Sequence, residues 1–194
     1  MTVIMNSEIT VVSGLPRSGT SLMMQMLYQG GLEVVTDRER VADEDNPAGY
    51  FEFEPVKKMN QETSWLPHAR GKVVKVISQL LFDLPATERY AIVFMQRNLA
   101  EVLASQDKML ARSGRKGASH EMMRSAFQNH LTKLAGWMER QPHMRVLHVD
   151  YSQVVAEPLA EAERINAFLG GGLDTKVMAG AVDPRLYRNR ATNA

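Results

Sequence analysis

The chain contains no cysteine among its 194 residues. Without cysteine it can form no disulfide bond, offer no thiolate to a metal ion and use no thiol as a nucleophile. Such a composition suits a reducing compartment, so we expect a cytoplasmic protein. The five histidines show none of the spacings typical of metal ligands, and we expect no metal site.

An excess of charge of one sign is also lacking. Lysine and arginine together number 23 and aspartate and glutamate 22, which gives a net charge of +1 at pH 7. This balance creates no broad electrostatic field for nucleic acid or for an anionic membrane, so we expect neither partner. Any anion-binding site must therefore be local.

Long apolar runs are absent as well. No stretch approaches the ~18 consecutive apolar residues that indicate a membrane-spanning helix. The first residues, MTVIMNSEI, lack the basic start and the apolar stretch of a signal peptide. We expect a soluble protein.

Short apolar runs alternate along the chain with helical patterns. Runs rich in β-branched residues predict buried strands over residues 9–12, 73–77, 91–95 and 145–149. Apolar residues at helical spacing predict helices over residues 20–28, 99–110, 120–140 and 158–169. Strands that alternate with helices predict an α/β fold, a three-layer sandwich with a central parallel sheet. With no linker and no repeat, we expect a single domain over residues 1–194.

The turn after the first predicted strand has most of a phosphate-binding pattern. In the stretch SGLPRSGTS, Gly14, Gly19 and Ser21 fit the P-loop spacing G-x-x-x-x-G-K-[ST], but Thr20 stands where the lysine is required. The sequence therefore leaves open whether this is a nucleotide-hydrolysing loop without its lysine or a loop for a different anion.

A strand that ends in a tight turn and opens a helix directs backbone N–H groups and the positive helix end at one point. Ser18, Thr20 and Ser21 add hydroxyl donors, and Arg17 supplies a positive charge. The planar guanidinium suits the oxygens of a tetrahedral anion. We therefore expect an anion site here, the alternative being an ordinary turn with a solvent-facing arginine.

A magnesium-dependent nucleotide site is less well supported. Such a site needs an acidic residue at the end of another strand. The strand over residues 91–95 is followed instead by Gln96 and Arg97, and only Asp150 offers a carboxylate in such a place. A P-loop phosphotransferase or NTPase remains an alternative.

A second basic feature follows the third predicted strand. Arg97 lies at its carboxyl end, and Ser105 follows about two helical turns later. In an open parallel sheet, ligands bind beyond the carboxyl ends of the strands, so Arg97 and the glycine loop should share one rim. The alternatives are an ion pair of Arg97 with Glu101 and a packing role for Ser105.

These motifs together resemble those of the PAPS-dependent sulfotransferases, in particular a small bacterial-type single-domain member. In that family a loop of the type P-[KR]-[ST]-G-T-[ST] binds the 5′-phosphosulfate of 3′-phosphoadenosine 5′-phosphosulfate (PAPS), and an R-(x)7-S element binds the 3′-phosphate. Here these read PRSGTS and RNLAEVLAS, and VDYSQVVAEPLAEAERINAFLG, residues 149–170, is similar to a third family segment. The resemblance covers residues from about 9 to 170.

The resemblance implies a P-loop NTPase-like fold and transfer of a sulfuryl group from PAPS to a hydroxyl or amine of a small-molecule or glycan acceptor. PAPS would be the co-substrate and PAP the product, with no metal. The implied cofactor-binding residues are Pro16, Arg17, Ser18, Gly19, Thr20, Ser21, Arg97 and Ser105, with Arg17 also catalytic. A catalytically inactive PAPS-binding or nucleotide-binding module is a further alternative.

One match to the family is partial. Lys75 corresponds to the lysine of a K-T-H segment in the cytosolic members, where it lies near the transferred group. The histidine of that segment is replaced by Ile77. Lys75 is therefore a candidate catalytic residue, the alternative being a surface lysine at the end of a strand, and a histidine base at position 77 is excluded.

Candidates for the base lie in the charged segment DEDNPAGYFEFEP, within a long loop over residues 36–55. Strand alternation across GYFEFE would place Tyr50, Glu52 and Glu54 on one side. We favour Glu52 as the base, then Glu54, with Asp45 behind, against the alternative of a solvated acidic loop. At the other end of the chain, Arg188 could add a cofactor-binding charge.

Overall fold

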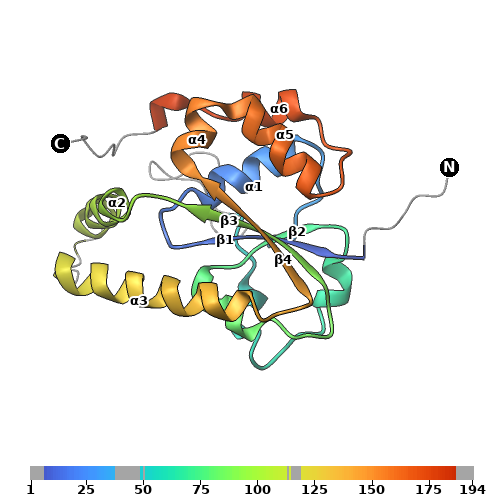
Figure 1. The fold of residues 1–194 in the computed structure, drawn as a ribbon, viewed down its shortest axis with the longest axis horizontal. Helices are drawn as coiled ribbons and strands as arrows, with labels where there is room; N and C mark the ends of the chain where they lie inside the picture. Colours follow the sequence, from blue (N-terminus) through green and yellow to red (C-terminus); the bar gives the residue numbers. More distant parts are fainter. Residues whose placement is uncertain (1–6, 38–48, 50, 113, 115–118, 187–194) are drawn as a thin grey trace.

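The computed structural model of the chain describes residues 7–37, 49, 51–112, 114 and 119–186. Four strands form one sheet in the order β2-β1-β3-β4. The strands are β1 (Ile9–Gly14), β2 (Val73–Lys75), β3 (Tyr90–Gln96) and β4 (Met144–Asp150). Every neighbouring pair is parallel, so the carboxyl ends of the strands meet at one rim (Figure 1). The predicted α/β fold class and its four strands are confirmed.

Helices cover both faces of the sheet, as Figure 1 shows. One face carries the helices α1 (Thr20–Gln29), α4 (Tyr151–Ala156), α5 (Pro158–Phe168) and α6 (Thr175–Gly180). The other face carries α3 (His120–Met138) and the 3-10 helices η1 (Glu54–Lys58), η2 (Leu66–Ala69) and η3 (Ser78–Asp83). A last 3-10 helix, η4, spans Pro184–Leu186.

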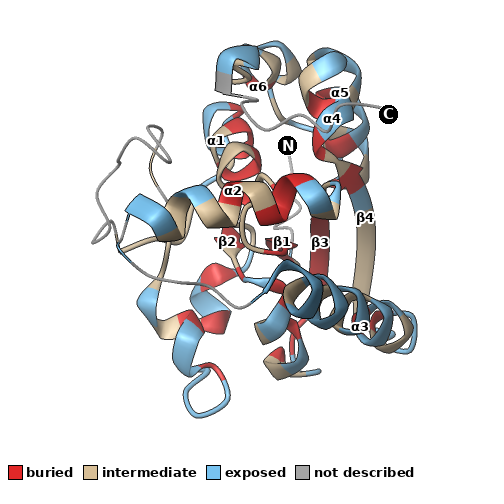
Figure 2. Cartoon of the chain, turned by 90° about the vertical axis from the view of Figure 1, so that its left-hand side faces the viewer, coloured by how far each residue is buried: buried red, intermediate tan, exposed pale blue. Residues whose placement is uncertain are grey.

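Helix α2 (Leu99–Arg112) lies at the rim and not over a face of the sheet. In Figure 2, which looks at the molecule from the side toward which β1 and β3 point, α2 crosses in front of the strand ends. The residues of α2 are therefore placed where a ligand of the rim would bind.

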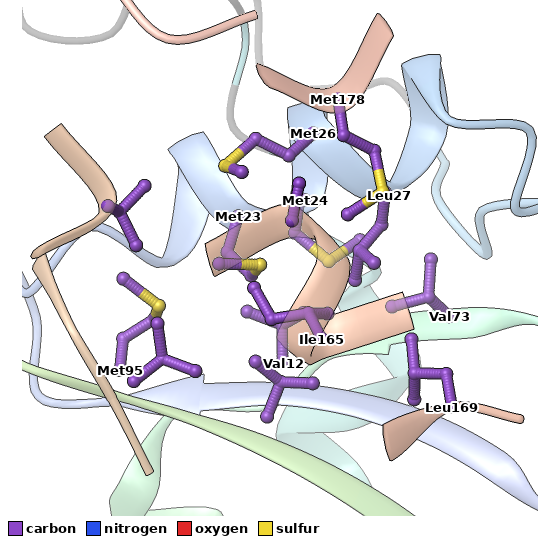
Figure 3. Packing of buried hydrophobic residues seen from close by; sticks show 14 of the residues in the cluster. Val12, Met23, Met24, Met26, Leu27, Val73, Met95, Ile165, Leu169 and Met178 are labelled. Carbon is purple, nitrogen blue, oxygen red and sulfur yellow. The ribbon is translucent and has the colours of Figure 1, made fainter. Parts of the chain in front are cut away.

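The core on the α1 side is rich in methionine. Met23, Met24 and Met26 of α1 are fully buried and pack with Ile165 of α5 and Met178 of α6 (Figure 3). Methionine is unbranched and flexible, so it fills irregular gaps between helices of different direction. This packing fixes α1, and with it the loop that precedes α1.

Two predictions about strands were wrong in part. Strand β4 is not fully buried, because it lies at the edge of the sheet and, among the described strands, pairs with β3 alone; His148 is exposed and Val149 buried. The strand predicted over residues 73–77 ends at Lys75, because the chain turns into η3.

Two short helices, α4 and α6, were not predicted. Asp150 caps α4, since its Oδ1 accepts hydrogen bonds from the backbone N–H groups of Ser152 at 2.7 Å and Gln153 at 3.4 Å. Asp174 caps α6 in the same way. Such caps satisfy helix amides that otherwise have no partner.

The packing of the core predicts that alanine substitutions at two positions of α5 differ in their effect on the free energy of unfolding. Ile165 is fully buried in the core, whereas Leu159 is 41% exposed on the same helix. Ile165→Ala should lower the free energy of unfolding by about 2–5 kcal/mol, because it removes buried methylenes and leaves a cavity. Leu159→Ala should change it by less than about 1 kcal/mol. Urea denaturation followed by circular dichroism measures both, and equal losses would contradict the packing described.

Candidate functional site

The loop between β1 and α1 has a backbone that requires glycine at two places. Gly14 has φ 149° and Gly19 has φ 101°. A Cβ atom on Gly14 would lie 2.5 Å from Ser18 Oγ and 2.6 Å from the carbonyl oxygen of Met95. On Gly19 it would lie 2.4 Å from the ring of Tyr151. The loop therefore folds closely over the ends of β3 and β4.

The loop directs donors to one point. Met23 N–H makes the first α1 hydrogen bond, to the carbonyl oxygen of Gly19 at 3.1 Å. The amides just before Met23 thus have no intrahelical partner and lie at the positive end of the helix dipole. Ser18 is 1% exposed, and its Oγ has no hydrogen-bond partner among the described residues. A buried hydroxyl left in this state fits a site for an anion's oxygen.

Arg17 links the loop to α2. Its Nε donates a hydrogen bond to Ser105 Oγ at 3.0 Å, and its carbonyl oxygen accepts one from Arg97 Nη1 at 3.3 Å. Arg17 itself has φ 70°, in the left-handed region. The structure thus brings together three residues predicted from two separate motifs, Arg17, Arg97 and Ser105.

Arg97 is held by a buried ion pair. Its Nε lies 2.9 Å from Glu101 Oε2, and the two side chains are only 9% and 5% exposed. The guanidinium also lies over the ring of Tyr151, 4.4 Å from its centroid. The ion pair with Glu101, offered above as an alternative to ligand binding, is present; it also fixes the guanidinium at the rim.

Sequence reasoning did not identify Glu101 and Tyr151 as site residues. The spacing of four residues between Arg97 and Glu101 indicated an ion pair on one face of a helix. The sequence did not indicate that this pair is buried. Burial raises the pKa of the Tyr151 hydroxyl. The nearby charges have smaller effects on this pKa: Arg97 and Arg17 lower it and Glu101 raises it. Tyr151 is therefore a neutral hydroxyl in the ordinary pH range, packed under Gly19.

Lys75 reaches the loop from β2. Its Nζ donates a hydrogen bond to Ser21 Oγ, 3.1 Å away, in the first turn of α1. A third cation therefore lies at the same rim as Arg17 and Arg97.

The predicted strand at GYFEFE is wrong. Residues 51–53 form no strand, Phe51 has φ 51°, and Glu54 begins η1. Pro55 explains the change, because proline offers no N–H to a ladder and favours the first turn of a helix. The alternation that grouped Glu52 with Glu54 therefore does not exist.

The segment around Glu52 nevertheless lies at the rim. The carbonyl oxygen of Glu52 accepts hydrogen bonds from Thr36 Oγ1 at 2.8 Å and from Asp37 N–H at 3.3 Å. Val34, two residues before Thr36, bridges to β2 in parallel. Glu54 pairs with Lys57 at 2.7 Å on the exposed surface. The remaining candidates Asp45, Tyr50 and Arg188 lie outside the described residues.

Within the described residues, no group of three or more His, Asp or Glu side chains is arranged to hold a metal ion. Asp150, the acid considered above for magnesium, caps α4. No helix in the described ranges is long and apolar enough to cross a bilayer.

Comparison with known proteins identifies the family. A model of the family described as "Sulfotransferase family" matches residues 72–174, more than half of the chain. The chain belongs to the sulfotransferase family. The matched region includes Lys75, Arg97, Ser105 and Tyr151, whereas the glycine loop lies before it. A search of curated proteins finds no significant match.

Solved structures of sulfotransferases share the fold. The sulfotransferase domain of the Synechococcus PCC 7002 olefin synthase has a TM-score of 0.59 at 14% identity, with 96% of this chain and 89% of that chain covered. The sulfotransferase domain from the curacin biosynthetic pathway has a TM-score of 0.53 at 12% identity, with coverages of 94% and 86%. The predicted P-loop NTPase-like sulfotransferase fold is confirmed.

The close approach of Gly19 to Tyr151 gives a prediction with a matched control. Gly19 and Gly31 have nearly equal φ, 101° and 102°, but a Cβ on Gly31 would meet no atom of the described residues within 4 Å. Gly31→Ala should cost about 1–2 kcal/mol of unfolding free energy, from backbone strain alone. Gly19→Ala should cost more, because it also displaces the Tyr151 ring. Thermal or urea unfolding compares the two, and equal costs would contradict the contact.

The buried ion pair gives a second prediction. Glu101→Leu should lower the free energy of unfolding by about 3–5 kcal/mol, because it leaves the Arg97 guanidinium buried without its carboxylate. Arg97→Met combined with Glu101→Leu should cost much less than the sum of the single changes. The exposed pair serves as control, and Lys57→Met should cost less than about 1 kcal/mol. Additive losses in the Arg97–Glu101 double variant would show that the two side chains do not interact.

Proposed function

We propose that this chain transfers a sulfuryl group from PAPS to a hydroxyl or amine of a small-molecule or glycan acceptor. The observation that carries the proposal is the hydrogen bond between Arg17 and Ser105, which joins the glycine loop to the R-(x)7-S element. One anion site at the loop and a second at Arg97 suit a donor that has phosphate groups at two places.

The loop fits a 5′-phosphosulfate. Ser18 Oγ is buried without a described partner, and a Cβ on Gly14 would fill the space beside it. The hydroxyls of Thr20 and Ser21 and the amides at the start of α1 add donors. Arg17 and Lys75 would neutralise the charge that develops on the phosphate oxygen as the bond to sulfur breaks.

The second site fits a 3′-phosphate. Arg97 supplies the guanidinium, and Ser105 supplies a hydroxyl. Since a serine hydroxyl both accepts and donates, Ser105 can keep its bond from Arg17 and donate its own proton to a phosphate oxygen. The ion pair with Glu101 holds Arg97 in place before the ligand binds.

Glu52 remains our sequence-based candidate for a carboxylate on the acceptor side. The hydrogen bonds from Thr36 and Asp37 to its carbonyl oxygen support a position at the rim. A carboxylate there could anchor an amine or hydroxyl, or remove its proton.

Calorimetric titration with PAP and with ATP tests the proposal. The wild-type protein should bind PAP without magnesium and bind ATP more weakly, because ATP lacks the 3′-phosphate. No detectable binding of PAP at millimolar concentration would overturn the proposal. Magnesium-dependent binding of ATP would instead support a phosphotransferase or NTPase.

The arrangement of two anion sites predicts which variants have a lower affinity for PAP. Arg97→Ala and Ser105→Ala should weaken PAP far more than adenosine 5′-phosphosulfate, which lacks the 3′-phosphate. For Arg97→Ala the difference should be about 1.5–3 kcal/mol, the value of a hydrogen bond to a charged group. Arg164→Ala, on an exposed side chain of α5, serves as control and should leave both affinities unchanged. Equal losses for the two ligands would assign Arg97 and Ser105 to another role.

A further inference from the structure

The imidazole of His130 lies close to the carboxyl end of β2. Its Nε2 is 2.9 Å from Ser78 Oγ, and Ser78 is fully buried at the start of η3. Ser78 follows Lys75 by three residues, a span of at most ~11 Å, and Lys75 Nζ contacts Ser21 of the loop at 3.1 Å. His130 therefore lies below the same rim as the glycine loop, on the α3 side of the sheet.

The hydrogen bonds of Ser78 fit one tautomer of the imidazole. Ser78 Oγ donates a hydrogen bond to Gln79 Oε1 at 3.3 Å. It can then accept one from His130 Nε2 when that nitrogen carries the ring proton. In this tautomer the lone pair is on Nδ1, which is then the atom that can accept a proton.

The surroundings keep this imidazole neutral and fixed. Burial lowers the pKa of His130, and the charged residues nearest in sequence on the two elements that meet here are Asp83 of η3 and Lys133 of α3. The Phe82 ring packs edge-on against His130, with centroids 6.1 Å apart, and against Trp137 at 4.9 Å. A neutral, held imidazole is suited to act as a base near neutral pH.

A second buried hydroxyl lies on this face. Val11 packs in the core on the α3 side and Val12 in the core on the α1 side, so Ser13 faces α3. Val76 N–H donates to the carbonyl oxygen of Val12 at 3.0 Å, which keeps the start of η3 beside the end of β1. Ser13 is fully buried, and its Oγ has no hydrogen-bond partner among the described residues. Polar atoms of a ligand would supply the hydrogen bond that Ser13 Oγ lacks among these residues.

We infer that His130 accepts the proton of the acceptor hydroxyl during sulfuryl transfer, an inference that rests on the function proposed above. The acceptor oxygen forms a bond to sulfur while the bond from sulfur to the 5′-phosphate oxygen breaks. The electron pair of that bond stays on PAP, and the acceptor's proton moves to Nδ1 of His130. Ile77 and Phe82, which are 38% and 41% exposed and flank Ser78 and His130, favour a hydroxyl carried on an apolar or aromatic body.

Nuclear magnetic resonance tests the position of His130 without any acceptor. The protein is labelled at histidine Cε1, and His130→Gln assigns the His130 signal. PAPS should shift the His130 signal more than PAP does, because only PAPS places a sulfuryl group at the end of the loop. His143, whose carbonyl oxygen accepts from Tyr90 N–H at the opposite end of the strands, should not move. Binding of both nucleotides with equal or no effect on His130 would overturn the inference.

Kinetics test the proton transfer. With PAPS and phenol, His130→Gln should lower kcat by ~10²-fold or more and remove the acidic limb of the pH profile. With 4-nitrophenol above its pKa, where the acceptor is already ionised, the loss should be much smaller. PAP affinity should stay at the wild-type value.

The rival base gives the opposite outcome. If Glu52→Gln abolishes the transfer to phenol while His130→Gln keeps the wild-type kcat and pH profile, the inference is wrong. Failure of the proposed function is distinguishable. A phosphotransferase or NTPase would bind neither PAP nor PAPS in the calorimeter, and an inactive nucleotide-binding module would bind them while the wild-type protein transferred no sulfuryl group to phenol.

Discussion

The buried contact of Arg97 with Glu101 and Tyr151 is the interaction on which the geometry of the rim depends. It fixes the end of β3 to the first turn of α2 and to the first residue of α4. The same guanidinium donates to the carbonyl oxygen of Arg17, so the glycine loop is tied to this point as well. Because burying charges in a protein is costly unless they are paired, this cluster has one well-defined arrangement. A single side chain thus orients four segments of the chain.

The parallel sheet positions the other polar groups near the rim. All four strands present their carboxyl ends to one side, and α2 lies across them (Figure 2). Polar groups on the α1 side of the sheet, from the loop and Lys75, would face the donor anion of the proposed reaction. Polar groups on the α3 side, Ser78 and His130, lie beyond the end of β2. The two sets lie on opposite faces of one sheet, and the transfer proposed above would take place between a donor on one side and an acceptor on the other.

The strands and the long helices were predictable, because each buries an apolar run or stripe that the sequence displays. Arg17, Arg97 and Ser105 were predictable as a group, since parallel strands bring their carboxyl ends together. The helices α4 and α6 were not, because six residues are too short to show a period. Pro55 overrode the alternation around Glu52, and β4 is only partly buried because no strand in the described part of the chain pairs with its outer edge.

Other site residues could not have been read from the sequence. The partner of His130 is 52 residues away, so no local pattern marks that histidine. The place of Tyr151 under Gly19 depends on the register of β4 against β3. Both contacts are products of the tertiary fold and become visible only when the sheet is assembled.

The distance in sequence between Arg17 and Ser105, 88 residues, has a kinetic consequence. Parallel strands joined by long crossovers close large loops before they gain contacts, so such sheets form slowly. The anion site needs β1, β3 and α2 in their final positions, and no fragment of the sheet contains it. A nucleotide bound there would stabilise only the completed fold and would slow its global opening, leaving the fraying of the outer helices unchanged.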